Sequence, residues 1–301
     1  MDFGTTLLFE KETGLEKSAA AAAKAGFKYI DFDLTGPYDC NIKDEEKNFT
    51  GYRKTLESMG LSVIQAHAPY LKFISTDKKD VINLGLLEKV KDSVRRAALL
   101  GAKYLAFHCY VPYTKAQAEG REEYDYAKMA KENFDFNVSF LSQLVPYLKE
   151  YKVKLALENV NAYDFTKRAH APTVCHTSEE CNRFIDVLGD ECFCICFDAG
   201  HLNLCLGENF SEFTSALGSR VAIVHMHDNF GIQNDWFGEL DRHLPPFIGS
   251  LEWEKLNQAL KNINFQGVYS FECNSYGRTQ FIDREYQYIY DCGKMIFDEK
   301  Q

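Results

Sequence analysis

Histidine, aspartate and glutamate recur at one place in this sequence, the last residue of a short β-rich run. Six consecutive runs end this way, at QAH, LAFH, LALE, CICFD, IVH and YSFE. The side chains concerned are His67, His108, Glu158, Asp198, His225 and Glu272. Imidazole nitrogens combined with carboxylate oxygens suit Zn, Mn, Co or Fe better than calcium, which prefers oxygen ligands alone. The pattern therefore predicts a centre for one of these divalent metals.

Three further candidate ligands stand outside the six runs. His201 lies in DAGH, just after the fourth of these runs, and Asp241 and His243 lie in DRHLPP. The nine candidates exceed what a single ion needs, so we expect one ion and allow for up to three. His227 follows His225 by two residues and could take its place as a ligand.

The carboxylates carry this prediction more strongly than the histidines do when each is taken singly. Glu158 stands behind the apolar run LAL, and a buried carboxylate is costly unless it is paired or bound to a metal. Asp198 and Glu272 follow apolar runs in the same way. A lone histidine at a strand end is more often a hydrogen-bonded structural residue. The assignment of His67 and His108 as ligands therefore depends on the position that they share with the other candidates at strand ends.

Strand side chains alternate between two faces, and this alternation identifies the interior of the expected fold. The residues two positions before the strand-end candidates are mostly small or apolar. They are Gln65, Ala106, Ala156, Cys196, Ile223 and Ser270. Cys192, Cys194 and Cys196 share one face, and we interpret them as small core residues rather than as a thiolate site.

Eight β-rich runs alternate with helical patterns along the chain. We expect strands at residues 5–9, 29–34, 62–66, 104–108, 154–158, 193–198, 221–225 and 268–272. We expect helices at residues 15–25, 45–58, 85–100, 124–150, 178–188, 210–217, 251–261 and 285–297. This alternation predicts the α/β class and a (β/α)8 TIM barrel, formed by a single domain that spans residues 1–301. A doubly wound sheet is the alternative, but the sequence lacks its glycine-rich phosphate loop.

Local signals mark several helix ends. Gly26, Gly60 and Gly101 each follow a helical run, as glycines that end helices do. Ser178 is followed by two glutamates and is expected to cap the helix that begins there.

Composition and charge exclude several classes of protein. The chain of 301 residues has a formal net charge of −10, which opposes broad binding to nucleic acid. We expect no membrane segment, because no apolar run approaches the roughly 18–20 residues of a spanning helix. The first residues lack the pattern of a signal peptide, and the ten cysteines form no CxxC pair. We therefore expect reduced thiols and a cytoplasmic location.

The ordered motifs from Ala66 to Glu272 resemble the xylose isomerase-like TIM barrel superfamily, which holds sugar isomerases and epimerases together with endonuclease IV. In its ketose 3-epimerase branch one metal is held by Glu, Asp, His and Glu from four strands, which implies Glu158, Asp198, His225 and Glu272 here. His225 is preferred to His227 because it stands three residues before an acid, as the family's ligand does. Endonuclease IV uses nine ligands for three zinc ions, and the nine candidates match that set.

The resemblance also implies residues that contact a substrate. His201 and Asp164 match positions that contact the sugar in the epimerases, whereas Gly231 stands where those enzymes have a substrate-binding arginine. Among the aromatic residues, the candidates for covering a bound sugar are Phe9, Tyr70, Trp236 and Phe247.

We therefore expect a metal-dependent isomerase or epimerase of a monosaccharide, free or phosphorylated. The metal would stabilise an enediolate, Glu158 and Glu272 would exchange the proton as base and acid, and His201 would orient a hydroxyl. The alternatives are a trinuclear hydrolase of the endonuclease IV type and a non-catalytic sugar-binding barrel. The expected partner is a small sugar or sugar phosphate rather than nucleic acid or a membrane, and a homo-oligomer is compatible with the sequence.

Overall fold

Eight parallel strands close into a barrel, and each strand lies beside its neighbours in sequence order. They are β1 (Phe3–Thr6), β2 (Tyr29–Asp33), β3 (Ser62–His67), β5 (Tyr104–His108), β7 (Lys154–Glu158), β10 (Phe193–Asp198), β11 (Val221–Met226) and β12 (Tyr269–Phe271). β1 pairs with both β2 and β12, which closes the ring. The computed structural model describes residues 2–7, 14–35, 44–70, 74–75, 81–111, 113–114, 125–164, 169–170, 173–205, 207–232, 241–273 and 279–298. Within these residues the predicted (β/α)8 TIM barrel is confirmed.

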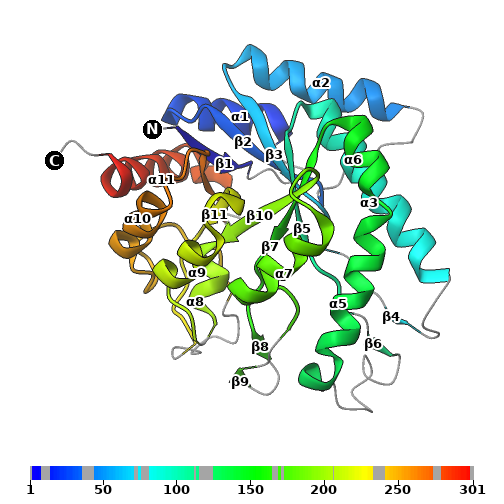
Figure 1. Cartoon of the computed structure of the whole chain (residues 1–301). Coiled ribbons are helices and arrows are strands. Elements are labelled where there is room, and N and C mark those ends of the chain that lie inside the picture. The colour runs from blue at the N-terminus through cyan, green and yellow to red at the C-terminus, as the bar shows by residue number, and fades with distance from the viewer. Residues whose placement is uncertain are drawn as a thin grey trace.

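Helices cover the outside of the barrel (Figure 1). They are α1 (Gly14–Ala25), α2 (Glu45–Ser58), α3 (Val81–Leu100), α5 (Tyr126–Ser142), α6 (Val145–Tyr151), α7 (Ser178–Leu188), α8 (Ala199–Asn203), α9 (Phe210–Leu217), α10 (Trp253–Asn262) and α11 (Ile282–Phe297). Tyr290 of α11 packs edge-on against Phe3 and Phe27, with ring centroids 5.7 and 5.2 Å apart, so the last helix closes over the first strand. In the part of the chain that is described, no helix is both long and apolar enough to cross a membrane.

The helix expected at residues 124–150 is in fact two helices. A turn at Gln143 and Leu144 separates α5 from α6, and Pro146 lies in the first turn of α6. Proline has no backbone N–H to continue a helix from the preceding turn, which explains why one long helix was the wrong expectation.

Other element boundaries also differ from the sequence expectation; for example, α3 begins at Val81 and α11 at Ile282, before the expected residues 85 and 285. β1 begins at Phe3 instead of residue 5, because Phe3 already pairs with β12. Thr177, not Ser178, caps α7, since its hydroxyl accepts a hydrogen bond from the backbone N–H of Glu180 at 3.2 Å. The backbone N–H of Ser178 instead donates to the Glu208 carboxylate at 2.8 Å.

Short side chains fill the lower interior of the barrel. Ala106, Ala156, Cys194, Cys196 and Ile223 form a cluster separate from the core between the strands and the helices. The predicted interior positions are all buried, including the polar residues Gln65 and Ser270. The interpretation of the cysteine run as core is consistent with this packing.

The strand-end candidates lie at one mouth of the barrel because the strands are parallel, so their carboxyl ends face the same way. His108 lies opposite Glu158 on the neighbouring strand, and Asp198 lies opposite His225. Two small sheets rise from the loops after β3, β5 and β7. They are β4 (Ile74–Ser75) with β6 (Tyr113–Thr114), and β8 (Tyr163–Asp164) with β9 (Ala169–His170). Both lie below the barrel in Figure 1.

One buried carboxylate ties the outer helices together and does not belong to the mouth. Glu45 at the start of α2 is 2% exposed. It accepts hydrogen bonds from Arg95, whose Nε lies 2.8 Å from Oε2, and from Arg96. This pair of arginines on α3 therefore balances the buried charge of α2.

The glycine after α1 yields a prediction about stability. Gly26 has φ +114°, and a Cβ there would lie 2.6 Å from the ring of Tyr290. We expect Gly26→Ala to lower the free energy of unfolding by about 2–3 kcal/mol, because backbone strain adds to the displacement of a packed ring. Gly60→Ala is the matched control, since Gly60 has φ +78° but open space around its Cβ. We expect it to cost about 1 kcal/mol in urea unfolding; equal losses for the two variants would contradict the packing role of Gly26.

Candidate metal centre

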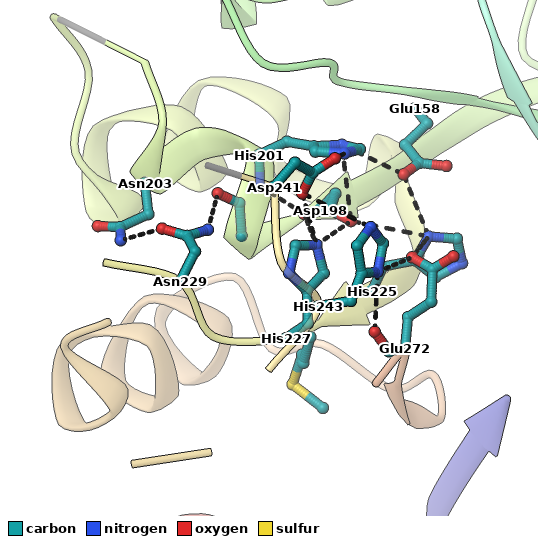
Figure 2. A network of polar contacts seen from close by, with 12 residues as sticks. Glu158, Asp198, His201, Asn203, His225, His227, Asn229, Asp241, His243 and Glu272 are labelled. Atoms are coloured by element: carbon teal, nitrogen blue, oxygen red, sulfur yellow. Dashed lines mark hydrogen bonds and ion pairs between the residues drawn. The ribbon is translucent and has the colours of Figure 1, made fainter. Parts of the chain in front are cut away.

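His225 stands among three carboxylates at the barrel mouth (Figure 2). Its Nδ1 lies 3.2 Å from Oε1 of Glu158, 3.2 Å from Oε2 of Glu272 and 3.9 Å from Oδ2 of Asp198. One potential ligand atom from each of these four residues lies within 4.8 Å of the others. All but Glu272 are fully buried. The four residues named from the sequence as metal ligands are therefore neighbours in space.

Two histidines flank Glu158 on the side of β3 and β5. Nε2 of His67 lies 3.1 Å from Oε2 of Glu158, and Nε2 of His108 lies 3.3 Å from the same oxygen. These three side chains form a second group of potential ligand atoms within 4.8 Å. Glu158 thus faces two groups with its two carboxylate oxygens.

A third group lies on the other side of Asp198 and contains His201, His227, Asp241 and His243. Nε2 of His201 lies 3.1 Å from Oδ2 of Asp241, and Nε2 of His243 lies 3.5 Å from its Oδ1. The His227 ring stacks on His243 with centroids 3.9 Å apart, and its Nε2 lies 3.2 Å from Asp198. His227 therefore joins this group and does not replace His225.

Three histidines use their two ring nitrogens in the same way. Nδ1 of His67 donates to the carbonyl of Ala68 at 2.7 Å, and Nδ1 of His201 donates to that of Asn159 at 2.9 Å. Nδ1 of His243 likewise donates to a backbone carbonyl, that of residue 272, at 2.9 Å. A neutral ring then turns the lone pair of Nε2 toward a carboxylate oxygen, which is repulsive unless a cation lies between them. Metal-binding histidines commonly hold their second nitrogen in this manner.

Several buried polar atoms of the cluster have no hydrogen-bond partner. They include Oε1 of Glu158, Oε2 of Glu272 and Nδ1 of His225, although these atoms approach one another to 3.2 Å. An unsatisfied buried polar atom costs about 1–3 kcal/mol, and more when it is charged. Lone pairs that converge without forming hydrogen bonds are the arrangement that a divalent cation requires, so these residues fit a metal ion.

The electrostatics of the cluster couple buried acids to buried imidazoles. Burial alone would lower the pKa of His67, but its hydrogen bond to Glu158 and the charge of that residue raise it to about 9. Asp241 and neighbouring acids similarly outweigh burial and raise the pKa of His243 to about 10. Burial would raise the pKa of Glu158, yet the surrounding imidazoles hold it well below its ordinary value. The cluster thus demands positive charge to balance its carboxylates.

Cys196 lies beside this centre without the character of a thiolate ligand. Its sulfur lies within 4.8 Å of potential ligand atoms of Glu158 and His225. Burial raises the pKa of the thiol well above its ordinary value, which favours the neutral thiol over the thiolate.

Asn159 and Asp198 lock the ends of two neighbouring strands together. The Asn159 amide donates to the Asp198 carbonyl at 2.9 Å and accepts from the Asp198 backbone N–H at 2.8 Å. The Asp198 carboxylate also accepts from the backbone N–H of His201 at 2.6 Å and so caps α8. The position of His201 is therefore fixed relative to Asp198.

Gly200 allows His227 to enter the cluster. A Cβ at Gly200 would lie 2.1 Å from Cε1 of His227, so no larger residue fits beside this ring. The Asn229 amide donates to the Gly200 carbonyl at 2.8 Å and accepts from Asn203 at 2.8 Å, as Figure 2 shows. These contacts hold α8 against the end of β11.

Asp228 anchors the loop that carries the DRH triplet. Its backbone forms an antiparallel bridge with Leu244, with N–O distances of 2.7 and 2.9 Å. Its carboxylate accepts hydrogen bonds from the backbone N–H of Leu251 and from the Trp253 indole, at 3.0 and 3.2 Å. His243 has φ +47°, a strained conformation of the kind found at functional sites.

Three side chains that were expected to contact a substrate, including that of Phe9, lie outside the described part of the chain. Trp236 lies outside the described residues, and for Asp164 only the backbone, in β8, is described. Sequence reasoning missed Asp31, a buried residue of β2 whose Oδ2 lies 2.8 Å from Nε2 of His225. A signal was available, because Asp31 alternates with the apolar residues Ile30 and Phe32 and so had to face the barrel interior.

The sequence of this chain is similar to a known family of TIM barrels and to a curated relative. The family model described as xylose isomerase-like TIM barrel matches residues 19–292. A probable endonuclease 4 from Staphylococcus aureus is 25% identical over 265 residues, which cover 84% of this chain and 81% of that protein.

Solved structures share the fold over nearly the whole chain. D-psicose 3-epimerase from Clostridium cellulolyticum H10, solved with D-tagatose, superposes with a TM-score of 0.73 at 14% identity and covers 98% of this chain and 99% of its own. A D-tagatose 3-epimerase-like protein gives a TM-score of 0.67 at 23% identity, with coverage of 97% and 99%. From the match over residues 19–292, the chain belongs to the xylose isomerase-like TIM barrel family.

Proposed function

We propose that this protein is a metal-dependent isomerase or epimerase of a monosaccharide, free or phosphorylated. One observation carries the proposal: Glu158 at the end of β7 and Glu272 just after β12 approach Nδ1 of His225 at 3.2 Å, and each keeps a carboxylate oxygen without a hydrogen bond. The likeness to solved sugar 3-epimerases supports it. We further propose that residues 1–301 act as one domain, in the cytoplasm, where the thiols would stay reduced.

A divalent ion of Zn, Mn, Co or Fe, when bound, would polarise the sugar carbonyl and lower the energy of the enediolate. We assign Glu158, Asp198, His225 and Glu272 to holding it. Glu158 and Glu272 also act as the proton-transfer pair: one carboxylate removes the proton from the carbon beside the carbonyl, and the other returns a proton to that carbon or its neighbour. Their origin on β7 and after β12 places them on different sides of the mouth.

Other residues are proposed to bind the sugar. His201 has Nδ1 committed to a backbone carbonyl, which leaves Nε2 for a sugar hydroxyl or for Asp241. Tyr70 is 57% exposed with its ring 5.6 Å from that of His108, a position suited to covering a bound sugar. We also assign Asp164 and Trp236 to substrate contact.

A trinuclear metallohydrolase of the endonuclease type is the second candidate. The observation that favours it is the presence of three adjoining groups of potential ligands. The second group includes His67 and His108, and the third includes Asp241 and His243. The formal net charge of −10 disfavours a DNA substrate, because duplex binding calls for several phosphate contacts from lysine and arginine.

Removal of one carboxylate should separate metal binding from folding. We expect Glu158→Gln and Glu272→Gln each to lower turnover by about 100- to 10,000-fold and to weaken metal retention, with circular dichroism unchanged. Glu45→Gln is the matched control, because it removes a buried carboxylate bound to arginines and should leave metal content intact. Full activity of a chelated, verifiably metal-free sample would contradict metal dependence.

The third ligand group can be tested through Asp241. If this group holds an ion, Asp241→Asn should reduce the number of ions bound per chain, because Asp241 faces both His201 and His243. If the group binds substrate instead, the same change should raise KM at constant metal content. Metal analysis combined with steady-state kinetics distinguishes the two, and no change in either would refute both roles.

Substrate class is tested by two parallel assays on the same metal-loaded preparation. We expect deuterium from solvent to enter at least one sugar in a panel of ketoses, aldoses and their phosphates, because proton transfer to carbon exchanges with water. We expect no comparable nicking of a duplex that contains an abasic site. Efficient nicking without exchange into any sugar would overturn the isomerase proposal in favour of the hydrolase.

A further inference from the structure

A buried carboxylate lies beneath the centre, on the far side of His225 from the proposed ligands. Asp31 on β2 is 1% exposed, and its Oδ2 lies 2.8 Å from Nε2 of His225 on β11. The two strands are not neighbours in the barrel, so the contact crosses its interior. The amide of Gln65 donates to the same oxygen at 2.8 Å. Because a carboxylate only accepts, the amide must present its NH2 group there.

The backbone is adjusted to bring this pair together. Ile30 of β2 lies opposite Val63 of β3, but the next residue, Asp31, lies opposite Gln65, so the register shifts by one and Ile64 is passed over. Such irregularities re-aim side chains and concentrate near functional sites. Here the shift sets Gln65 beside Asp31 and fixes the direction of the carboxylate.

His225 differs from three other histidines of the cluster in what its second nitrogen faces. His67, His201 and His243 each donate Nδ1–H to a backbone carbonyl and turn Nε2 to the centre. His225 is reversed: it turns Nδ1 toward the carboxylates of the centre, and Nε2 faces Asp31 instead of a carbonyl. A neutral imidazole has a single N–H, so the side that holds the proton decides which nitrogen is left as a ligand.

We propose that Asp31 is a positioning residue that holds the His225 proton on Nε2 and thereby directs the Nδ1 lone pair into the space between the carboxylates of Glu158, Asp198 and Glu272. The inference rests on the proposed metal centre and adds a residue outside the ligand set. Neither nitrogen of His225 has an aligned hydrogen bond, so the proximity of the negative oxygen selects the position of the proton. A carboxylate behind a ligand histidine also makes the histidine a stronger donor to a metal.

The test combines metal affinity with a direct view of the proton. Mn²⁺ dissociation constants would be measured for wild type, Asp31→Ala and Asp31→Asn. Long-range proton–nitrogen spectra of histidine-labelled, Zn²⁺-loaded protein would report which nitrogen of His225 carries the proton, with His225→Gln to assign the signal. We expect Asp31→Ala to weaken Mn²⁺ binding about 10- to 100-fold and to expose the Nε2 proton to rapid exchange. The isosteric Asp31→Asn keeps an oxygen that accepts a hydrogen bond, so its Mn²⁺ affinity should lie between those of wild type and Asp31→Ala.

The controls separate this inference from simple destabilisation and from failure of the proposed function. Glu45→Gln removes an equally buried carboxylate and should lower stability while leaving Mn²⁺ affinity and the His225 signal unchanged. If Asp31→Ala matches wild type in Mn²⁺ affinity and in the Nε2 signal of His225, the positioning role is refuted while the metal centre stands. If the alanine variant does not fold, the same comparison is made with Asp31→Asn. If wild type binds neither Mn²⁺ nor Zn²⁺, both proposals fall.

Discussion

The carboxylates of Glu158 and Asp198 are completely buried at the mouth of the barrel, and their charge has to be balanced there. Asp31 adds a further buried charge below them, and Asp241 and Glu272 complete the set at the rim. Taking an ion out of water costs several kcal/mol, so such a concentration of negative charge persists only beside positive charge. The histidines can supply it as imidazolium, and a metal can supply it in their place. The residues around the mouth are therefore arranged so that positive charge lies beside the buried carboxylates.

Rigidity follows from the way the histidines are held. Backbone carbonyls that directly follow β3, β7 and β12 accept hydrogen bonds from the rings of His67, His201 and His243 and fix their orientation. The Asn159 amide fastens two strand ends, and Asp228 fastens the loop that enters from beyond β11. Ligand groups held this firmly keep their lone pairs convergent even though like charges and lone pairs repel. Preorganisation of this kind is what electrostatic catalysis requires.

The strand-end ligands could be predicted from the sequence because they depend on local rules. Alternation along a strand and parallel pairing between strands place the last residues at one mouth, whatever the loops do. Alternation along β2 places Asp31 in the barrel interior, but its contact with His225 crosses the barrel, and no spacing along the chain encodes that contact. His227 was treated only as a substitute for His225, since its direction beyond the strand depends on the space beside Gly200. The break in the helix at 124–150 depended on a single proline, Pro146.

The close approach of Gly200 to His227 has a consequence for how such barrels diverge. A methyl group at residue 200 would overlap the imidazole, so a side chain at 200 is incompatible with this position of the ring at 227. Loss of the ring, by contrast, releases the glycine from selection. The two positions, 27 residues apart in the chain, should therefore be inherited as a pair, and the glycine can be lost only after or together with the histidine. Among related barrels, a side chain at position 200 would then mark those that lack the imidazole at position 227.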